Sequence, residues 1–310
     1  MSLHTGALTA ALTLGAACAS APRPTPDASS RTPDALRLNT DADRADGVGV
    51  YTSIPWGFET NTFWLEGPSG VVVIDTQFLP SEAARALAHI EHVTGKRVVL
   101  AVVLHPNPDK FNGADVYRAH GTRVISSAQV VAAIPAVAAQ RRRAFQSRYA
   151  PDYPSTDPVV EPFGDASTTL DAAGLSLRLH VLGQGCSEAH VVVTWNGHLF
   201  GGDLLVSQTH AWLELGYVDA WRARVREMRA MAPRRVHPGR GPSGDITLLD
   251  ETDRYLARAE ELVRDGLARH LPVEQGVEAA RAALVQAYPA HGYPVFLFGL
   301  RRVWERLAAP

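Results

Sequence analysis

The chain predicts an α/β fold, a four-layer α/β/β/α sandwich, across residues 47–310. Residues 70–76 read GVVVIDT, a continuous apolar run that is typical of a strand buried on both faces. A second strand-rich half follows at residues 175–201, where Asn196-Gly197 predicts a tight hairpin turn. Amphipathic helical patterns accompany both halves. Two strand-rich halves with outer helices predict two sheets packed face to face between helices.

The first half alternates strands with helices. Strands are predicted at residues 48–52, 62–65, 70–76, 97–104 and 122–125, and helices at 83–93 and 114–120. Residues 137–163 break this rhythm with an arginine run, Arg141 to Arg143, and four prolines. We expect this stretch to be a long excursion over the surface.

The second half begins with strands and ends with helices. Strands are predicted at residues 175–182, 190–195 and 198–201. From Asp219 onward the pattern is mainly helical, with apolar faces in residues 248–263, 273–284 and 295–307. We expect these helices to cover the outer face of the second sheet.

The N-terminal residues predict export. Residues 1–19 contain a small, apolar stretch like the centre of a secretory signal, and its end, LGAAC, resembles a lipobox that stops at Cys18. Either a lipid anchor on Cys18 or an ordinary cleaved signal fits this pattern. Residues 20–46 are rich in Pro, Ser and Thr and are expected to form a tether. The predicted location is the periplasm or the membrane surface of a bacterial envelope.

Composition limits the partners of the folded domain. The net charge of -2 gives no electrostatic reason to expect nucleic acid. No apolar run reaches the ~18 residues of a membrane-spanning helix, so contact with a membrane is expected only through a lipid on Cys18. A small-molecule substrate is the expected partner. With Cys18 in the leader, Cys186 is the one cysteine of the mature domain and forms no intrachain disulfide.

The most informative motif is the loop after the strand at residues 97–104. It reads LHPNPDKFNG over residues 104–113 and presents His105, Asn107, Asp109 and Lys110 in close succession. Four further blocks accompany it along the chain, and they read GVVVIDT (70–76), GQGCSEAHVVV (183–193), LFGGDLL (199–205) and HPGRG (237–241).

These five blocks, in this order, resemble the metallo-β-lactamase superfamily over roughly residues 48–241. The family's first motif reads His-x-His-x-Asp-His, and here its second and third histidines are Asn107 and Lys110. The resemblance implies a fold of the metallo-β-lactamase type. It also implies hydrolysis by metal-activated water, with zinc as the usual metal.

The family's two metal sites are carried over position by position. The positions of the first site are His105, Asn107 and Cys186. Those of the second site are Asp109, Lys110 and Arg240. The position that bridges two metals is Asp203.

The first site keeps donors that suit one zinc ion. His105, Cys186 and Asp203 offer an imidazole, a thiolate and a carboxylate, and leave a fourth position for water. Asn107 could add a weak amide oxygen. We therefore predict one zinc ion per chain, or none if the site is degenerate.

The second site has exchanged neutral donors for cations. Lys110 and Arg240 have no lone pair to give a metal at neutral pH, and both would repel a second cation. We expect one of them to fill the space of the second metal and balance Asp109 and Asp203. In a catalytic site, Lys110 and Arg240 would stabilise the developing oxyanion, with Asp109 as their acidic partner.

Two classes of function remain open at this point. The first is an exported hydrolase with a single metal that acts on an ester, lactone or lactam bond. The second is a catalytically degenerate protein of the same fold that binds a ligand or is structural; metal-free chemistry at Cys186 is a lesser alternative. His190 and His237 could be substitute ligands, but structural roles are expected for them, and Asp75 is expected to accept backbone hydrogen bonds.

Overall fold

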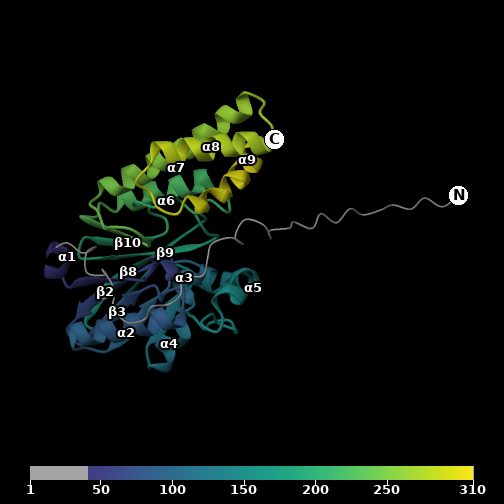
Figure 1. The fold of residues 1–310 in the computed structure, drawn as a ribbon. Helices are drawn as coiled ribbons and strands as arrows, with labels where there is room; N and C mark the ends of the chain where they lie inside the picture. Colours follow the sequence, from purple (N-terminus) through teal and green to yellow (C-terminus); the bar gives the residue numbers. More distant parts are fainter. Residues whose placement is uncertain (1–40, 310) are drawn as a thin grey trace. The chain divides into compact units, whose positions relative to one another are not determined.

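The computed structural model describes residues 41–309, and this part of the chain forms the predicted four-layer sandwich (Figure 1). The predicted signal segment, residues 1–19, and residues 20–40 of the predicted tether lie outside the described residues. Helix α1 (Asp41–Ala45) precedes the domain start expected at Gly47, so regular structure begins within the last residues of that tether. Its Asp43 is buried and paired with Arg235 of the second sheet.

The first sheet has the strand order β1-β2-β3-β4-β5-β6. Its strands are β1 (Val48–Thr52), β2 (Asn61–Gly67), β3 (Gly70–Ile74), β4 (Val98–Val102), β5 (Arg123–Ser126) and β6 (Glu161–Pro162). The pairs from β3 to β6 are parallel, and β1 to β3 pair antiparallel. Parallel strands end at the same edge of a sheet, so the segments that follow β3 and β4 meet there. Asp75 accepts a hydrogen bond from the Leu104 amide at that edge (2.9 Å), as expected.

The second sheet has the strand order β11-β10-β9-β8-β7. Its strands are β7 (Thr168–Ala172), β8 (Leu175–Leu182), β9 (His190–Trp195), β10 (His198–Gly202) and β11 (Arg235–Pro238). Within β9, Val191 and Val193 face the core shared with the first sheet, whereas Val192 faces the helices on the other side. This alternation follows the two-residue period of a strand and explains why the run is apolar throughout.

Helices cover the outer face of each sheet (Figure 1). The helices of the first half are α2 (Pro80–Thr94), α3 (Pro108–Phe111), α4 (Ala114–Ala119) and α5 (Ala128–Tyr149), with a 3-10 turn η1 (Pro55–Gly57). Those of the second half are α6 (Val218–Ala230), α7 (Thr247–Ala268), α8 (Val273–Ala287) and α9 (Leu300–Ala308), with the 3-10 turn η2 (Pro294–Gly299). Among residues 41–309, none of these helices has the length and apolarity needed to cross a membrane.

Two sequence predictions need correction. The expected excursion at residues 137–163 begins as helix: α5 runs to Tyr149, and only the remainder is irregular apart from β6. Ser127 caps its first turn by accepting from the Val130 amide, and its alanine-rich sequence favours helix. The region after Asp219 also contains strand β11, which pairs in parallel with β10. A four-residue strand between long helices carries too little periodicity to be detected.

Candidate functional site

The loop between β4 and α3 brings the predicted residues to the edge where the strands of the first sheet end. His105 lies in the loop that follows β4, and Asp109 and Lys110 lie in the single turn of α3. The side chain and the amide of Thr76, just after β3, both donate to the Lys110 carbonyl (2.8 and 2.9 Å). The Asn107 carbonyl accepts from the Lys110 amide (2.9 Å). These contacts fix the backbone from which Lys110 projects.

Lys110 lies between the carboxylates of the second-site position and the bridging position. Its Nζ is 2.8 Å from Oδ2 of Asp109 and 2.8 Å from Oδ1 of Asp203. It is also 3.9 Å from Oδ2 of Asp75. The side chain is fully buried, and the contact predicted from the sequence is present. The ammonium therefore stands among the acids that a second metal would join.

Arg240 pairs with the same two carboxylates. Its Nη2 is 2.6 Å from Oδ2 of Asp109, and its Nη1 is 2.8 Å from Oδ2 of Asp203. Its Nε donates to the Phe58 carbonyl (3.1 Å). The loop that carries Arg240 is held by Asn61 of β2, whose amide donates to the carbonyls of Pro238 (3.0 Å) and Gly241 (2.9 Å).

The electrostatics of this network follow from burial and from pairing. Burial opposes the ionised form of Asp203, but the charges of Arg240 and Lys110 outweigh it and hold its pKa well below its usual range. The same cations lower the pKa of Asp109 against the effect of burial. Asp75 is farther from the cations, and burial raises its pKa to about 8. The site is therefore charge-balanced by two cations against two ionised acids and one acid that readily holds a proton.

Cys186 and His105 lie beside this network, together with His190, which the sequence offers only as a possible substitute ligand. The donor atoms of His105, Cys186 and His190 all lie within 4.8 Å of one another. Asp203, the other predicted ligand, is 3.5 Å from His105 through Oδ2 and belongs to the ion-pair network instead. Asn107 starts α3 and is half-buried. The signal for His190 is its position, four residues after Cys186 at the start of the next strand.

His237, the other candidate substitute ligand, belongs to a different cluster. Its Nε2 is 2.8 Å from Nδ1 of His198, and its Nδ1 is 2.8 Å from the Ser243 hydroxyl. His198 in turn reaches Asp46 (2.9 Å). These hydrogen bonds engage both ring nitrogens of His237, and donor atoms of Asp43, His198 and His237 all lie within 4.8 Å of one another.

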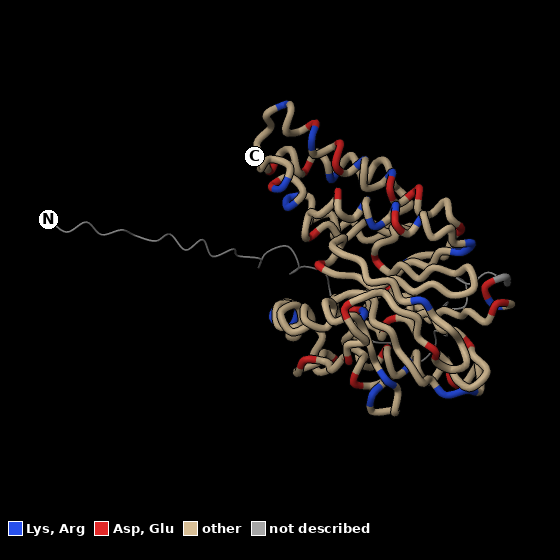
Figure 2. Tube along the Cα trace, turned by 180° about the vertical axis from the view of Figure 1, so that it is seen from behind, with Lys and Arg blue, Asp and Glu red and all other residues tan. Residues whose placement is uncertain are grey.

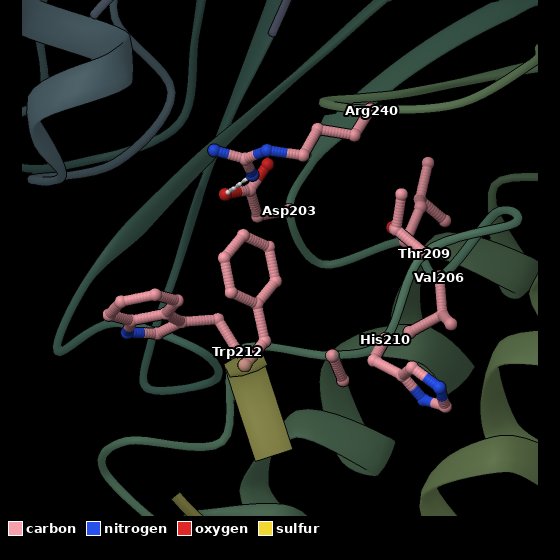
Figure 3. Close-up of a pocket in the computed structure, with 9 residues that line it drawn as sticks. Asp203, Val206, Thr209, His210, Trp212 and Arg240 are labelled. Carbon is pink, nitrogen blue, oxygen red and sulfur yellow. Dashed lines mark hydrogen bonds and ion pairs between the residues drawn. The ribbon is translucent and has the colours of Figure 1, made fainter. Parts of the chain in front are cut away.

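A small pocket opens beside the network (Figure 3). Arg240 and Asp203 form its polar side, and Figure 3 shows the two side chains meeting there with Trp212 nearby. The rest of the lining is mainly apolar and includes Phe296 and Val206. The cavity of about 20 Å³ holds about one water molecule.

Solved structures share this fold. The first is a metallo-beta-lactamase from Pontibacter korlensis, with 22% identity, a TM-score of 0.55, and coverage of 68% of this chain and 95% of that chain. The second is the metallo-beta-lactamase DIM-1, with 20% identity, a TM-score of 0.53, and coverage of 69% and 94%. At this level of identity the similarity shows the fold alone.

Comparison by sequence adds the family. No curated protein matches the chain significantly. The family model described as the metallo-beta-lactamase superfamily matches residues 55–240, which include all five motif blocks up to Arg240. The match covers more than half of the chain and ends within the loop that positions Arg240. The chain belongs to the metallo-beta-lactamase superfamily.

Proposed function

We propose that the protein is a hydrolase that cleaves an ester, lactone or lactam bond with a single metal ion. The observation that supports this proposal is the double pairing of Lys110 and Arg240 with Asp109 and Asp203. Two buried cations at the second-site positions leave donors for one metal, at His105 and Cys186. A bound zinc ion would supply an activated water molecule at neutral pH.

The two cations have different access to a substrate. Lys110 is fully buried between carboxylates, so its role is to balance charge and to position Asp203. Arg240 is 8% exposed and lines the pocket, so its guanidinium is the cation that can reach a developing oxyanion. Trp212 and Phe296 give the pocket an apolar side. We expect a substrate that places an apolar group next to the scissile carbonyl.

A non-catalytic binding protein is the second candidate. It is favoured by the completeness of the ion-pair network, in which both oxygens of Asp203 already contact cations. It is also favoured by the small size of the pocket. In this case the network is a structural replacement for the metals, and Cys186 tolerates substitution.

The test is metal-dependent turnover of chromogenic ester, lactone and cephalosporin substrates by the purified protein. We expect activity that a chelator removes and zinc restores. The substitution Arg240→Lys removes the forked contact of the guanidinium with Asp109 and Asp203 and should lower kcat/KM by about 10²-fold. The matched control is Arg229→Lys, an exposed residue of α6 that pairs with Asp250. No metal-dependent turnover of any of the three substrate classes would favour the binding protein.

The export prediction belongs to the same proposal. We propose that the hydrolase works outside the cytoplasm, attached through a lipid on Cys18. The support is the LGAAC sequence and the Pro, Ser and Thr residues that follow it. Labelled fatty acid should be incorporated into the wild-type protein in cells and not into Cys18→Ser. If the segment is an ordinary cleaved signal, neither protein is labelled and the substitution leaves export unchanged.

A further inference from the structure

Three donor atoms converge at one buried point. His105 comes from the loop after β4, Cys186 comes from the turn between β8 and β9, and His190 is the first residue of β9. Cys186 Sγ is 3.2 Å from Nε2 of His190. The rings of His105 and His190 are stacked with centroids 5.3 Å apart, and all three donor atoms lie within 4.8 Å of one another.

The far nitrogen of each ring is already held. Nδ1 of His190 is 2.9 Å from the Gly183 carbonyl, which can only accept, so this nitrogen carries the proton. Its Nε2 then has a lone pair that faces Cys186. Nδ1 of His105 is 2.8 Å from the Ser187 hydroxyl. Outer hydrogen bonds of this kind fix the tautomer and orientation of histidines that bind metals.

The inner nitrogen of His105 provides a separate observation. Its Nε2 is buried and has no hydrogen-bond partner within residues 41–309, although Asp203 Oδ2 lies 3.5 Å away. A buried polar atom without a partner is costly, and most such atoms are satisfied by a partner, a water or an ion. The side chain is 1% exposed, so bulk water does not satisfy it.

We infer that Nε2 of His105, Sγ of Cys186 and Nε2 of His190 bind one zinc ion, with His190 as the third ligand. This inference deepens the proposed function because it names the ligands of the single metal. Two imidazoles and a thiolate form a donor set that selects zinc over magnesium or calcium. On binding, the Cys186 thiol loses its proton to solvent as the metal–sulfur bond forms.

The set differs from the one expected from sequence. His190 takes the place expected for Asp203, whose oxygens are engaged by Lys110 and Arg240. Asp203 stays close enough to His105 to balance charge at the metal without ligating it. His190 therefore supplies, from a different position in the chain, the second imidazole that Asn107 does not provide.

The test uses cobalt(II) as a spectroscopic probe for zinc. Metal-free full-length protein is titrated with cobalt(II), and zinc affinity is then measured by competition. We expect one equivalent to bind with tetrahedral spectra and a thiolate-to-cobalt charge-transfer band. Cys186→Ser should abolish the band. His190→Gln should weaken zinc by more than the about 10–100-fold typical of residues that only support a ligand.

Matched variants separate the ligand sets. His180→Gln changes a half-buried histidine of β8 that contacts Thr194, and should leave the spectra and affinity unchanged. Asp203→Asn should keep the charge-transfer band. If Asp203 and not His190 were the ligand, zinc affinity would fall in Asp203→Asn and stay unchanged in His190→Gln. Circular dichroism of each variant establishes that it is folded before binding is interpreted.

The outcomes also separate this inference from the proposed function. One outcome is stoichiometric cobalt binding with a thiolate band that is lost in the Cys186 and His190 variants, but no hydrolysis by the wild type. This outcome supports the metal site and rejects the hydrolase. Metal-dependent hydrolysis without a thiolate band, or with full affinity in His190→Gln, retains the hydrolase and overturns the ligand set. No stoichiometric binding to the folded wild type overturns the inference.

Discussion

At the scale of single residues, the site is organised by charge replacement. A divalent metal would balance the two ionised acids Asp109 and Asp203, and here Lys110 and Arg240 do so. Burial would lower the pKa of Lys110, but the three neighbouring carboxylates outweigh it and raise that pKa. The lysine is therefore charged at neutral pH.

Removing this charge should be costly. In Lys110→Met the volume is kept, but Asp109 and Asp203 lose a buried partner, so we expect a loss of about 3–5 kcal/mol in the free energy of unfolding. Urea denaturation measures it. Lys96→Met is the control, because that lysine forms an exposed pair with Glu66 and should cost less than about 1 kcal/mol. Equal stability of Lys110→Met and wild type would contradict the charge-replacement model.

Gly239 makes room for the same network. A Cβ on this residue would lie 2.0 Å from Oδ1 of Asp203 and 2.7 Å from Nζ of Lys110. We expect Gly239→Ala to push the pair apart and to cost about 1–3 kcal/mol by overpacking. Gly292→Ala is the control, since its Cβ would meet only the Gln208 carbonyl at 3.8 Å. Thermal unfolding compares the two variants. If Gly239→Ala is as stable as the wild type, the network can adjust to the added methyl group.

At the scale of elements, the sequence predicts best where burial and periodicity agree. The strands β8 and β9 match their predicted bounds because their alternation or continuous apolar run is strong. The hairpin at Asn196-Gly197 is found where the dipeptide predicts it, with both residues at positive φ. Strand β11 has a weaker local signal and depends on a partner distant in the chain. In α5 the local helix signals are present, but the arginine run and the prolines that follow led to the prediction of an irregular stretch.

The candidate site shows the same division. The pairing of Lys110 with the acids could be predicted because chemistry requires a partner for a buried cation. The grouping of His190 with Cys186 could not, because it depends on how the turn before β9 places Cys186 against the first residue of that strand. Likewise, His237 contacts His198 because β10 pairs with β11, and no sequence motif predicts that pairing.

Helix α1 provides a prediction about where the folded domain begins. Asp43 is fully buried and takes both Nε and Nη2 of Arg235, at 2.9 and 2.8 Å. We expect Asp43→Ala to lower the free energy of unfolding by about 1.5–3 kcal/mol, the usual value for hydrogen bonds to charged groups. Asp157→Ala, in an exposed pair with Arg142, is the control. If the two variants are equally stable, α1 does not contribute to the domain.

At the scale of the whole molecule, surface and interior charges have different consequences. Figure 2 shows Lys and Arg interspersed with Asp and Glu along the chain, including its helices. Exposed pairs such as Arg269–Asp265 in α7 contribute little to stability. The pH dependence of stability should therefore come from buried groups whose pKa differs between the folded and unfolded states.

Three buried histidines and one buried acid set that dependence in opposite directions. Burial lowers the pKa of His190 and His237 to about 3 and that of His210 to about 4. Unfolding exposes these imidazoles, which bind protons below their ordinary pKa of 6.5, so stability falls as the pH drops from 6.5. Burial raises the pKa of Asp75 from 3.8 to about 8. The folded protein keeps this proton where the unfolded chain has lost it, so the stabilising contribution of Asp75 falls as the pH rises from about 3.8 to about 8.

Together these shifts predict greatest stability between about pH 6.5 and 7, where the unfolded histidines have lost about half or more of their protons while folded Asp75 still holds its own. The folded and unfolded states then bind similar numbers of protons. Urea unfolding of metal-free protein across this range should show the maximum. Asp75→Asn separates the two limbs, because an amide oxygen can still accept from the Leu104 amide but does not titrate. We expect the variant to lose the decline between pH 6.5 and 8 and to keep the acid limb. A decline that persists in Asp75→Asn would assign the alkaline limb to another group.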